Sequence, residues 1–170
     1  MTTPAVSNED LVRQFLATAE EFYGVPPPER ATFEVQEVSG ELHAEWDKER
    51  SHVTIRIQPG WDDYQRNGRL AHESFHVFSP ATLSEATYLD EGLAALLAKH
   101  CLNYLPFPDQ AKYCEALSLV ERLIATCPKS IRKLIGPGRR IALVSASDIV
   151  AACNKFPPND ADLLVRKFYA

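Results

Sequence analysis

Residues 72–76, with the sequence HESFH, limit what this chain can fold into more than any other segment. On an α-helix, residues four apart lie on one face, one turn above each other, so the imidazoles of His72 and His76 project in the same direction. Two imidazoles in that arrangement can occupy two corners of a tetrahedron around Zn²⁺. The segment therefore predicts a helix that carries part of a metal site, and the rest of the chain has to hold this helix in a core.

Glu73 follows His72 directly and therefore points about 100° further around the helix. That direction is too far away for Glu73 to join the same ligand set easily, but it allows the carboxylate to lean over an open coordination position. We expect Glu73 to act as general base on a metal-activated water and then to pass the proton to a leaving group. The motif thus indicates hydrolysis that needs no Ser or Cys nucleophile.

Three downstream carboxylates compete to be the third metal ligand: Glu85, Asp90 and Glu91. Gly92 has no side chain, so a helix beginning near Glu91 could pack close to the motif helix and bring that carboxylate to the metal. Asp90 has an alternative role, in which it accepts the outer N–H of a ligating histidine. We favour Glu91 over the other two.

The segment HESFH at 72–76, taken together with YLDEGLA at 88–94, resembles the gluzincin branch of the zincin metallopeptidases. The resemblance covers about residues 51–102, where the family has a strand, a motif helix and a second helix that often carries E-G-x-A. The separation between the two motifs is shorter than in the thermolysin-like and large aminopeptidase families and suits compact gluzincins. The chain has no G-x-M-E-N motif, so an aminopeptidase has no support.

This resemblance implies that His72, His76 and Glu91 bind Zn²⁺ and that Glu73 is the catalytic base. It also implies that the strand near 52–58 pairs with an extended substrate by β-addition. The expected function is therefore a zinc metallopeptidase that acts on a peptide or protein substrate.

An oxyanion-stabilising residue, which such enzymes often supply from Tyr or His, is not identified by the sequence. The alternative function is therefore a non-catalytic zinc-binding, zincin-like module that acts as a structural or regulatory interaction protein. Five residues are candidates for the oxyanion role: Tyr64, Tyr88, His100, Tyr104 and Tyr113.

The expected fold is α+β and zincin-like, in a single domain over residues 1–170. Within it we expect an N-terminal α/β subdomain over about 8–102 and a helical C-terminal subdomain over about 103–170. Period-two alternation predicts three strands, joined by tight turns at Ser39-Gly40 and 47–50 into an antiparallel meander. The predicted strands lie near 33–38, 42–46 and 52–58, and the predicted helices lie near 8–23, from Asn67 to before Ser79, from Thr82 or Thr87 to Leu102, and near 109–127, 129–135, 146–154 and 159–168.

Composition excludes several classes of protein. The 18 basic and 23 acidic side chains give a net charge of −5, which argues against a nucleic-acid partner. The chain has one concentration of basic residues, which we expect to be solvent-exposed surface: Lys129, Arg132, Lys133 and Arg139-Arg140. No stretch approaches the roughly 18 apolar residues of a membrane span. Residues 1–10 lack a signal-peptide pattern, so we expect a cytoplasmic protein. The four cysteines are expected to be buried free thiols: Cys101, Cys114, Cys127 and Cys153.

Overall fold

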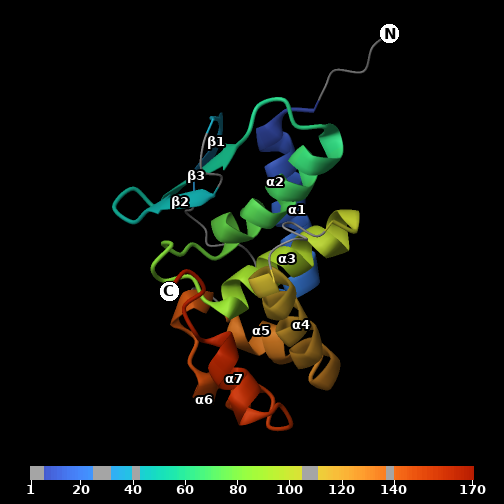
Figure 1. The fold of residues 1–170 in the computed structure, drawn as a ribbon, viewed down its shortest axis with the longest axis vertical. Coiled ribbons are helices and arrows are strands. Elements are labelled where there is room, and N and C mark those ends of the chain that lie inside the picture. Colours follow the sequence, from blue (N-terminus) through green and yellow to red (C-terminus); the bar gives the residue numbers. More distant parts are fainter. Residues whose placement is uncertain (1–5, 25–31, 40–42, 105–110, 137–139) are drawn as a thin grey trace.

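The structure of the chain is a computed structural model that describes residues 6–24, 32–39, 43–104, 111–136 and 140–170. Figure 1 shows the three-stranded sheet at one end beside α1 and α2, α3 in the middle, and the shorter helices at the other end. The described elements are α1 (Asn8–Tyr23), β1 (Thr32–Glu37), β2 (Ala44–Asp47), β3 (His52–Ile57), α2 (Asp63–Phe78), α3 (Tyr88–Leu102), α4 (Ala111–Thr126), α5 (Ser130–Leu134), a 3₁₀ turn η1 (Ile141–Leu143), α6 (Ala146–Ala152) and α7 (Pro158–Leu164). The α+β class is confirmed.

Capping side chains set the starts of the two helices that matter most for the site. Asp62 accepts from the Gln65 N–H at 2.7 Å, so α2 begins one turn before the expected start near Asn67. Of the two predicted starts for the next helix, Thr87 is the one used. The Asp90 carboxylate accepts from the Thr87 N–H at 3.0 Å, and the Thr87 hydroxyl accepts from the Asp90 N–H at 3.3 Å. This reciprocal capping box places Glu91 in the first turn of α3.

The order of the strands differs from the prediction. β2 pairs with β3 antiparallel, but β1 pairs with β3 parallel, so β3 is central in the order β1-β3-β2. The predicted meander was wrong because alternation reports which face of a strand is buried, not which strand lies beside it. A parallel pair needs a long connection, and here β2 forms part of it. In the predicted Ser39-Gly40 turn, Gly40 lies outside the described residues.

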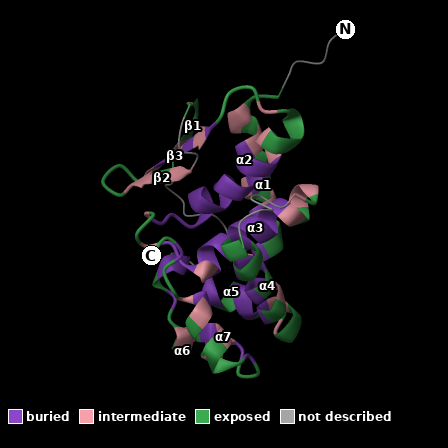
Figure 2. Ribbon diagram, viewed as in Figure 1, coloured by how far each residue is buried: buried purple, intermediate pink, exposed green. Residues whose placement is uncertain are grey.

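The helix that carries HESFH is buried on two sides. Under the sheet, Leu70 and Val77 of α2 pack in a cluster with Ile55 of β3. Phe75 of α2 belongs to a second, larger cluster that extends through α3 and α4 as far as Leu164 of α7. Figure 2 shows the second half of α2 and most of α3 as buried. Because both sides are packed, the helix has little freedom to reorient its histidines.

Gly92 brings α3 close to α4 and not, as the sequence suggested, to α2. A Cβ at this position would lie 2.5 Å from the Ala116 carbonyl oxygen and 2.6 Å from Val120 Cγ2. Real Cβ atoms do not approach backbone oxygen so closely, so only glycine permits this helix–helix distance. The absence of a side chain at Gly92 thus allows α4 to pack closely against α3.

The expectation of four buried free thiols was wrong. Cys127, just after α4, and Cys153, just after α6, form a disulfide with a Cα–Cα distance of 5.8 Å. Cys114 is exposed and Cys101 is half-buried. The bond joins residues far apart in the sequence, so spacing could not reveal it. Disulfides persist mainly in oxidising compartments, and the expected cytoplasmic location therefore loses part of its support.

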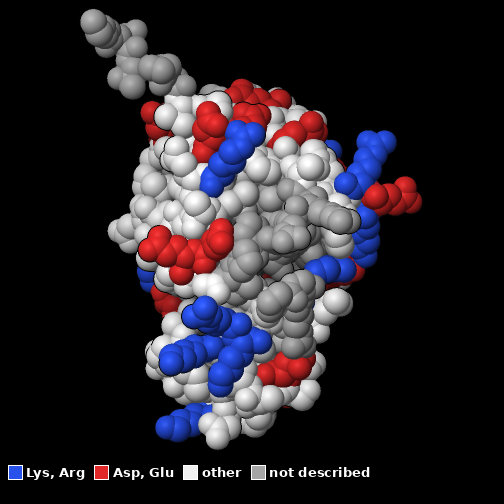
Figure 3. Space-filling model, turned by 180° about the vertical axis from the view of Figure 1, so that it is seen from behind, with Lys and Arg blue, Asp and Glu red and all other residues white. Residues whose placement is uncertain are grey.

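The surface carries charges of both signs. In Figure 3, which shows the molecule from behind, one cluster of Lys and Arg lies on the lower part, while in the upper part Asp and Glu lie beside further Lys and Arg. The basic residues Lys129, Arg132 and Lys133 are exposed, as predicted, whereas Arg139 lies outside the described residues. For Arg140 the prediction was wrong, because its side chain is only partly exposed and pairs with Glu85. Among the helices that the structure describes, none has the length and apolar character needed to cross a bilayer.

Candidate metal centre

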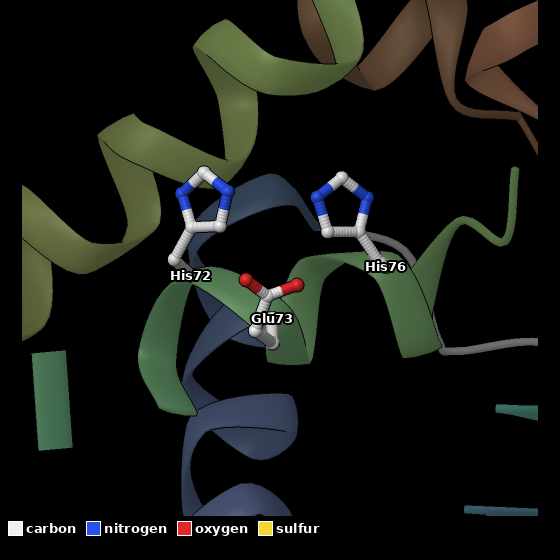
Figure 4. A group of neighbouring side chains, drawn as sticks. All are labelled: His72, Glu73 and His76. Carbon is white, nitrogen blue, oxygen red and sulfur yellow. The ribbon is translucent and has the colours of Figure 1, made fainter. Parts of the chain in front are cut away.

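His72, Glu73 and His76 come together on α2, and one potential ligand atom from each lies within 4.8 Å of the others. Figure 4 shows the two imidazoles side by side with the carboxylate between and below them. All three side chains are buried. The structure thus confirms that the motif forms a group close enough to hold a metal ion, although the sequence reasoning placed Glu73 outside the ligand set.

Glu91 approaches both histidines from α3. Its Oε2 atom lies 3.3 Å from His72 Nε2, and its Oε1 atom lies 3.6 Å from His76 Nε2. Ligand atoms around tetrahedral zinc, with bonds of 2.0–2.1 Å, are about 3.4 Å apart, which is longer than a good hydrogen bond. Glu91 Oε2 is buried and has no hydrogen-bond partner. The 3.3 Å distance between Oε2 and His72 Nε2, together with this unsatisfied oxygen, fits a cation held among the three side chains.

Burial favours the neutral forms of the histidines and of Glu91. It lowers the pKa of His72 to about 4 and also lowers the pKa of His76, although neighbouring carboxylates oppose the shift. Burial likewise raises the pKa of Glu91. Neutral imidazole is the form that binds metals. A bound cation would supply the positive counter-charge that a buried, ionised carboxylate needs.

Glu73 is held between its own helix and the sheet. Its Oε1 lies 3.1 Å from Arg69 Nη2, and each of these two side chains is only 4% exposed. Its Oε2 accepts a 3.0 Å hydrogen bond from the Ala44 N–H of β2. Arg69 was missed by the sequence reasoning, although its place four residues before Glu73 on a predicted helix is the spacing of a helical ion pair.

The two other candidates for third ligand have different roles. The Asp90 carboxylate accepts from the Thr87 N–H and hydroxyl in the cap of α3. Glu85 binds Lys48 and Arg140. Neither carboxylate lines the cavity beside the histidines.

A cavity of about 20 Å³ adjoins the two histidines, which is room for about one water molecule. Of the five oxyanion candidates, Tyr113 lines it; Tyr169, which no sequence signal marked, lines it too. The Tyr169 hydroxyl lies 3.2 Å from Glu91 Oε1 and 3.0 Å from the Tyr113 hydroxyl. His43, which precedes β2, also lines the cavity. The full lining is His43, Ala44, Arg69, His72, Glu73, His76, Ala81, Thr82, Leu83, Ala86, Glu91, Tyr113 and Tyr169.

An ion-pair cluster beside the cavity ties the sheet to the segment before α3. Glu85 accepts from Lys48 Nζ and from Arg140 Nη2, each at 2.7 Å. The Arg140 guanidinium also lies over the Trp46 ring of β2, 4.4 Å from its centroid. These contacts hold β2 against the residues that line one side of the cavity.

The cluster makes stability depend on pH in the acid range. Burial alone would raise the pKa of Glu85, but hydrogen bonds from Lys48 and Thr82 and the charge of Arg140 lower its pKa to about 2. The unfolded chain therefore takes up this proton first, and the stabilisation, complete above about pH 4.5, is lost as the pH falls toward 2. In urea unfolding across this range, we expect Glu85→Gln to show a flatter decline than wild type.

The matched control for Glu85→Gln is Glu115→Gln, which changes an exposed side chain of α4. Its unfolding free energy should follow the wild-type curve at every pH. If Glu85→Gln and wild type lose stability in parallel between pH 4.5 and 2, the cluster does not hold the Glu85 carboxylate in its ionised form.

The fold and the site together define an α+β protein with a buried His-Glu-His group able to hold a metal ion. Comparison of the chain with protein-family models, with curated proteins and with solved structures gave no match. The functional assignment therefore depends on the motif and on the geometry around it.

Proposed function

We propose that this chain is a compact, zincin-like metallopeptidase of the gluzincin type that uses Zn²⁺ to hydrolyse peptide bonds. One observation supports this most strongly: His72 and His76 from α2 and Glu91 from α3 converge beside a small cavity, with Glu73 next to them. Two imidazoles and one carboxylate, with a fourth position left for water, are a ligand set typical of catalytic zinc.

Of the two carboxylates near the histidines, Glu91 suits the ligand role better. Both oxygens of Glu73 already have partners, Arg69 and the Ala44 N–H. Glu91 Oε2, in contrast, is buried without a hydrogen bond, and a metal ion would satisfy it. We therefore assign Glu91 as the third ligand and keep Glu73 for proton transfer.

A zinc ion bound at this site would polarise the substrate carbonyl and lower the pKa of water. Glu73 takes the proton from the attacking water and then delivers it to the leaving amine nitrogen. Arg69 and the Ala44 N–H hold the Glu73 carboxylate in place, so it loses little orientational freedom before the proton transfer. Tyr113, one of the five candidates from the sequence, lines the cavity and could stabilise the oxyanion, and His43, which also lines it, is a new candidate.

The substrate would add to β2 and not to the strand near 52–58. That strand, β3, is paired on both sides. The Arg56 N–H donates to the His43 carbonyl, so the backbone groups of Ala44 and Trp46 point away from β3. They face the edge of β2 that pairs with no other described strand. This edge is adjacent to Glu73, because the outward Ala44 N–H reaches its carboxylate. An extended peptide along β2 would thus lie beside the metal.

Metal removal tests the proposal. Protein purified without added metal should contain stoichiometric zinc by elemental analysis, and a strong chelator should abolish peptide cleavage. Zinc added back after removal of the chelator should restore it. Cleavage by the zinc-free protein at the original rate would refute the proposed mechanism.

The second candidate is a zinc-binding module without hydrolytic activity. It is favoured by the narrow cavity, about 20 Å³, and by the two partners that occupy the Glu73 oxygens. In that case the protein would contain zinc but release no product from a mixture of peptides of varied sequence. A zinc-dependent product in the same assay would exclude this alternative.

A further inference from the structure

We infer that Tyr169 is a positioning residue for Glu91: its hydroxyl holds one carboxylate oxygen so that the other faces the metal. The inference rests on the proposed function, since it takes Glu91 as the third ligand. It adds a residue near the end of the described chain, far from both motifs in sequence, to the machinery of the site.

The two oxygens of Glu91 have different surroundings. The Tyr169 hydroxyl donates to Oε1 at 3.2 Å, whereas Oε2 is buried without a hydrogen bond and lies 3.3 Å from His72 Nε2. A carboxylate without such a bond can rotate and present either oxygen, or both, to a cation. With Oε1 held, Oε2 is the oxygen left to coordinate, so the geometry favours binding through one oxygen.

The backbone around Tyr169 is anchored to the start of α3. The Tyr88 N–H donates to the Arg166 carbonyl at 3.1 Å, and the Phe168 N–H donates to the Ala86 carbonyl at 2.9 Å. Phe168 is only 2% exposed. These bonds join residues 166–168 to the residues that lead into the first turn of α3, which carries Glu91. The Tyr169 hydroxyl and the Glu91 carboxylate are therefore held at a fixed position relative to each other. In Figure 1 the C-terminal end of the chain lies near the beginning of α3.

Tyr113 strengthens this placement from a third element. Its hydroxyl lies 3.0 Å from the Tyr169 hydroxyl, and its ring centroid lies 4.7 Å from that of Phe168. The Tyr169 hydroxyl can therefore accept from Tyr113 while it donates to Glu91, and such a chain of hydrogen bonds polarises each donor. α3, α4 and the 165–169 segment thus meet at a single ligand oxygen.

The test is the zinc affinity of Tyr169→Phe, measured by competition with a chromophoric chelator. Loss of an outer-shell hydrogen bond commonly weakens metal binding by about 10–100-fold, and we expect a loss in that range. The matched control is Tyr23→Phe. It removes a buried hydroxyl of α1 that donates at 2.7 Å to the Leu93 carbonyl of α3, the helix that carries Glu91. The control should bind zinc as wild type does, because it leaves the Glu91 carboxylate unchanged.

Each other outcome overturns the inference in a distinguishable way. If Tyr169→Phe binds zinc as tightly as wild type but its kcat falls, the hydroxyl acts on the reacting substrate and not on the ligand. If Tyr23→Phe weakens zinc binding equally, the loss reflects a loosened α3. If wild type itself binds no zinc, the proposed function fails first, and Tyr169 then has no ligand to position.

Discussion

Glu73→Gln is expected to lower kcat for peptide hydrolysis by about 10²–10⁴-fold, the usual contribution of a general base, and to leave zinc bound. The amide has nearly the shape of the carboxylate, and its oxygen can still accept from the Ala44 N–H. It cannot, however, accept a proton from water at neutral pH. The rate falls without loss of metal because Glu73 is assigned to proton transfer and not to the ligand set.

The measurement needs zinc content and kcat on the same preparation. Glu73→Gln also deprives the buried Arg69 of a counter-charge, and breaking a buried pair typically costs about 3–5 kcal/mol. The assay should therefore be run well below the thermal unfolding midpoint of the variant. Glu121→Gln, which changes the half-exposed ion-pair partner of Lys99 on α4, away from the cavity, serves as the control and should retain wild-type activity. Wild-type turnover by Glu73→Gln would remove Glu73 from the mechanism.

Glu91→Gln is expected to give the opposite result: zinc is lost, and activity is lost with it. The substitution removes the charged ligand between two neutral imidazoles, so the fall in zinc affinity should exceed the 10–100-fold that outer-shell changes commonly cost. Zinc content after dialysis and chelator competition measure it. High zinc concentrations should restore part of the activity, since the base Glu73 is still present.

The same substitution at two positions thus distinguishes the two carboxylates. His72, Glu73 and His76 on their own also satisfy the spacing of a metal site. If Glu73→Gln loses zinc and Glu91→Gln keeps it, that group is the ligand set, and the base has to be sought elsewhere. Because Gln has nearly the same size and shape as Glu, either result would reflect a change in charge and coordination and not a change in packing.

The parts of the fold that could be predicted depend on interactions within a turn or two of helix. The Ser7 cap and Gly24 in the left-handed region set the ends of α1 where the sequence placed them. The capping box at Thr87 belongs to the same class, although the sequence alone could not choose between it and Thr82. Such signals are readable because both partners lie three or four residues apart.

Strand order, the disulfide and the contact of Gly92 depend on tertiary packing, which local sequence patterns do not describe. Alternation in β1 reports a buried face but not its parallel pairing with β3. Cys127 and Cys153 meet only because α4 and α6 end near each other. Gly92 allows a close helix contact, and only the packed structure shows that the partner is α4 and not α2.

For the site, the sequence by itself determined that His72 and His76 share one face of a helix with Glu73 beside them, because α-helical geometry is the same wherever the helix packs. Only the tertiary structure decided that the Glu91 carboxylate reaches both imidazoles and that Tyr169 holds one of its oxygens. Those contacts join residues separated by turns, strands and whole helices. Their geometry is set by how the core packs, and no local spacing encodes it.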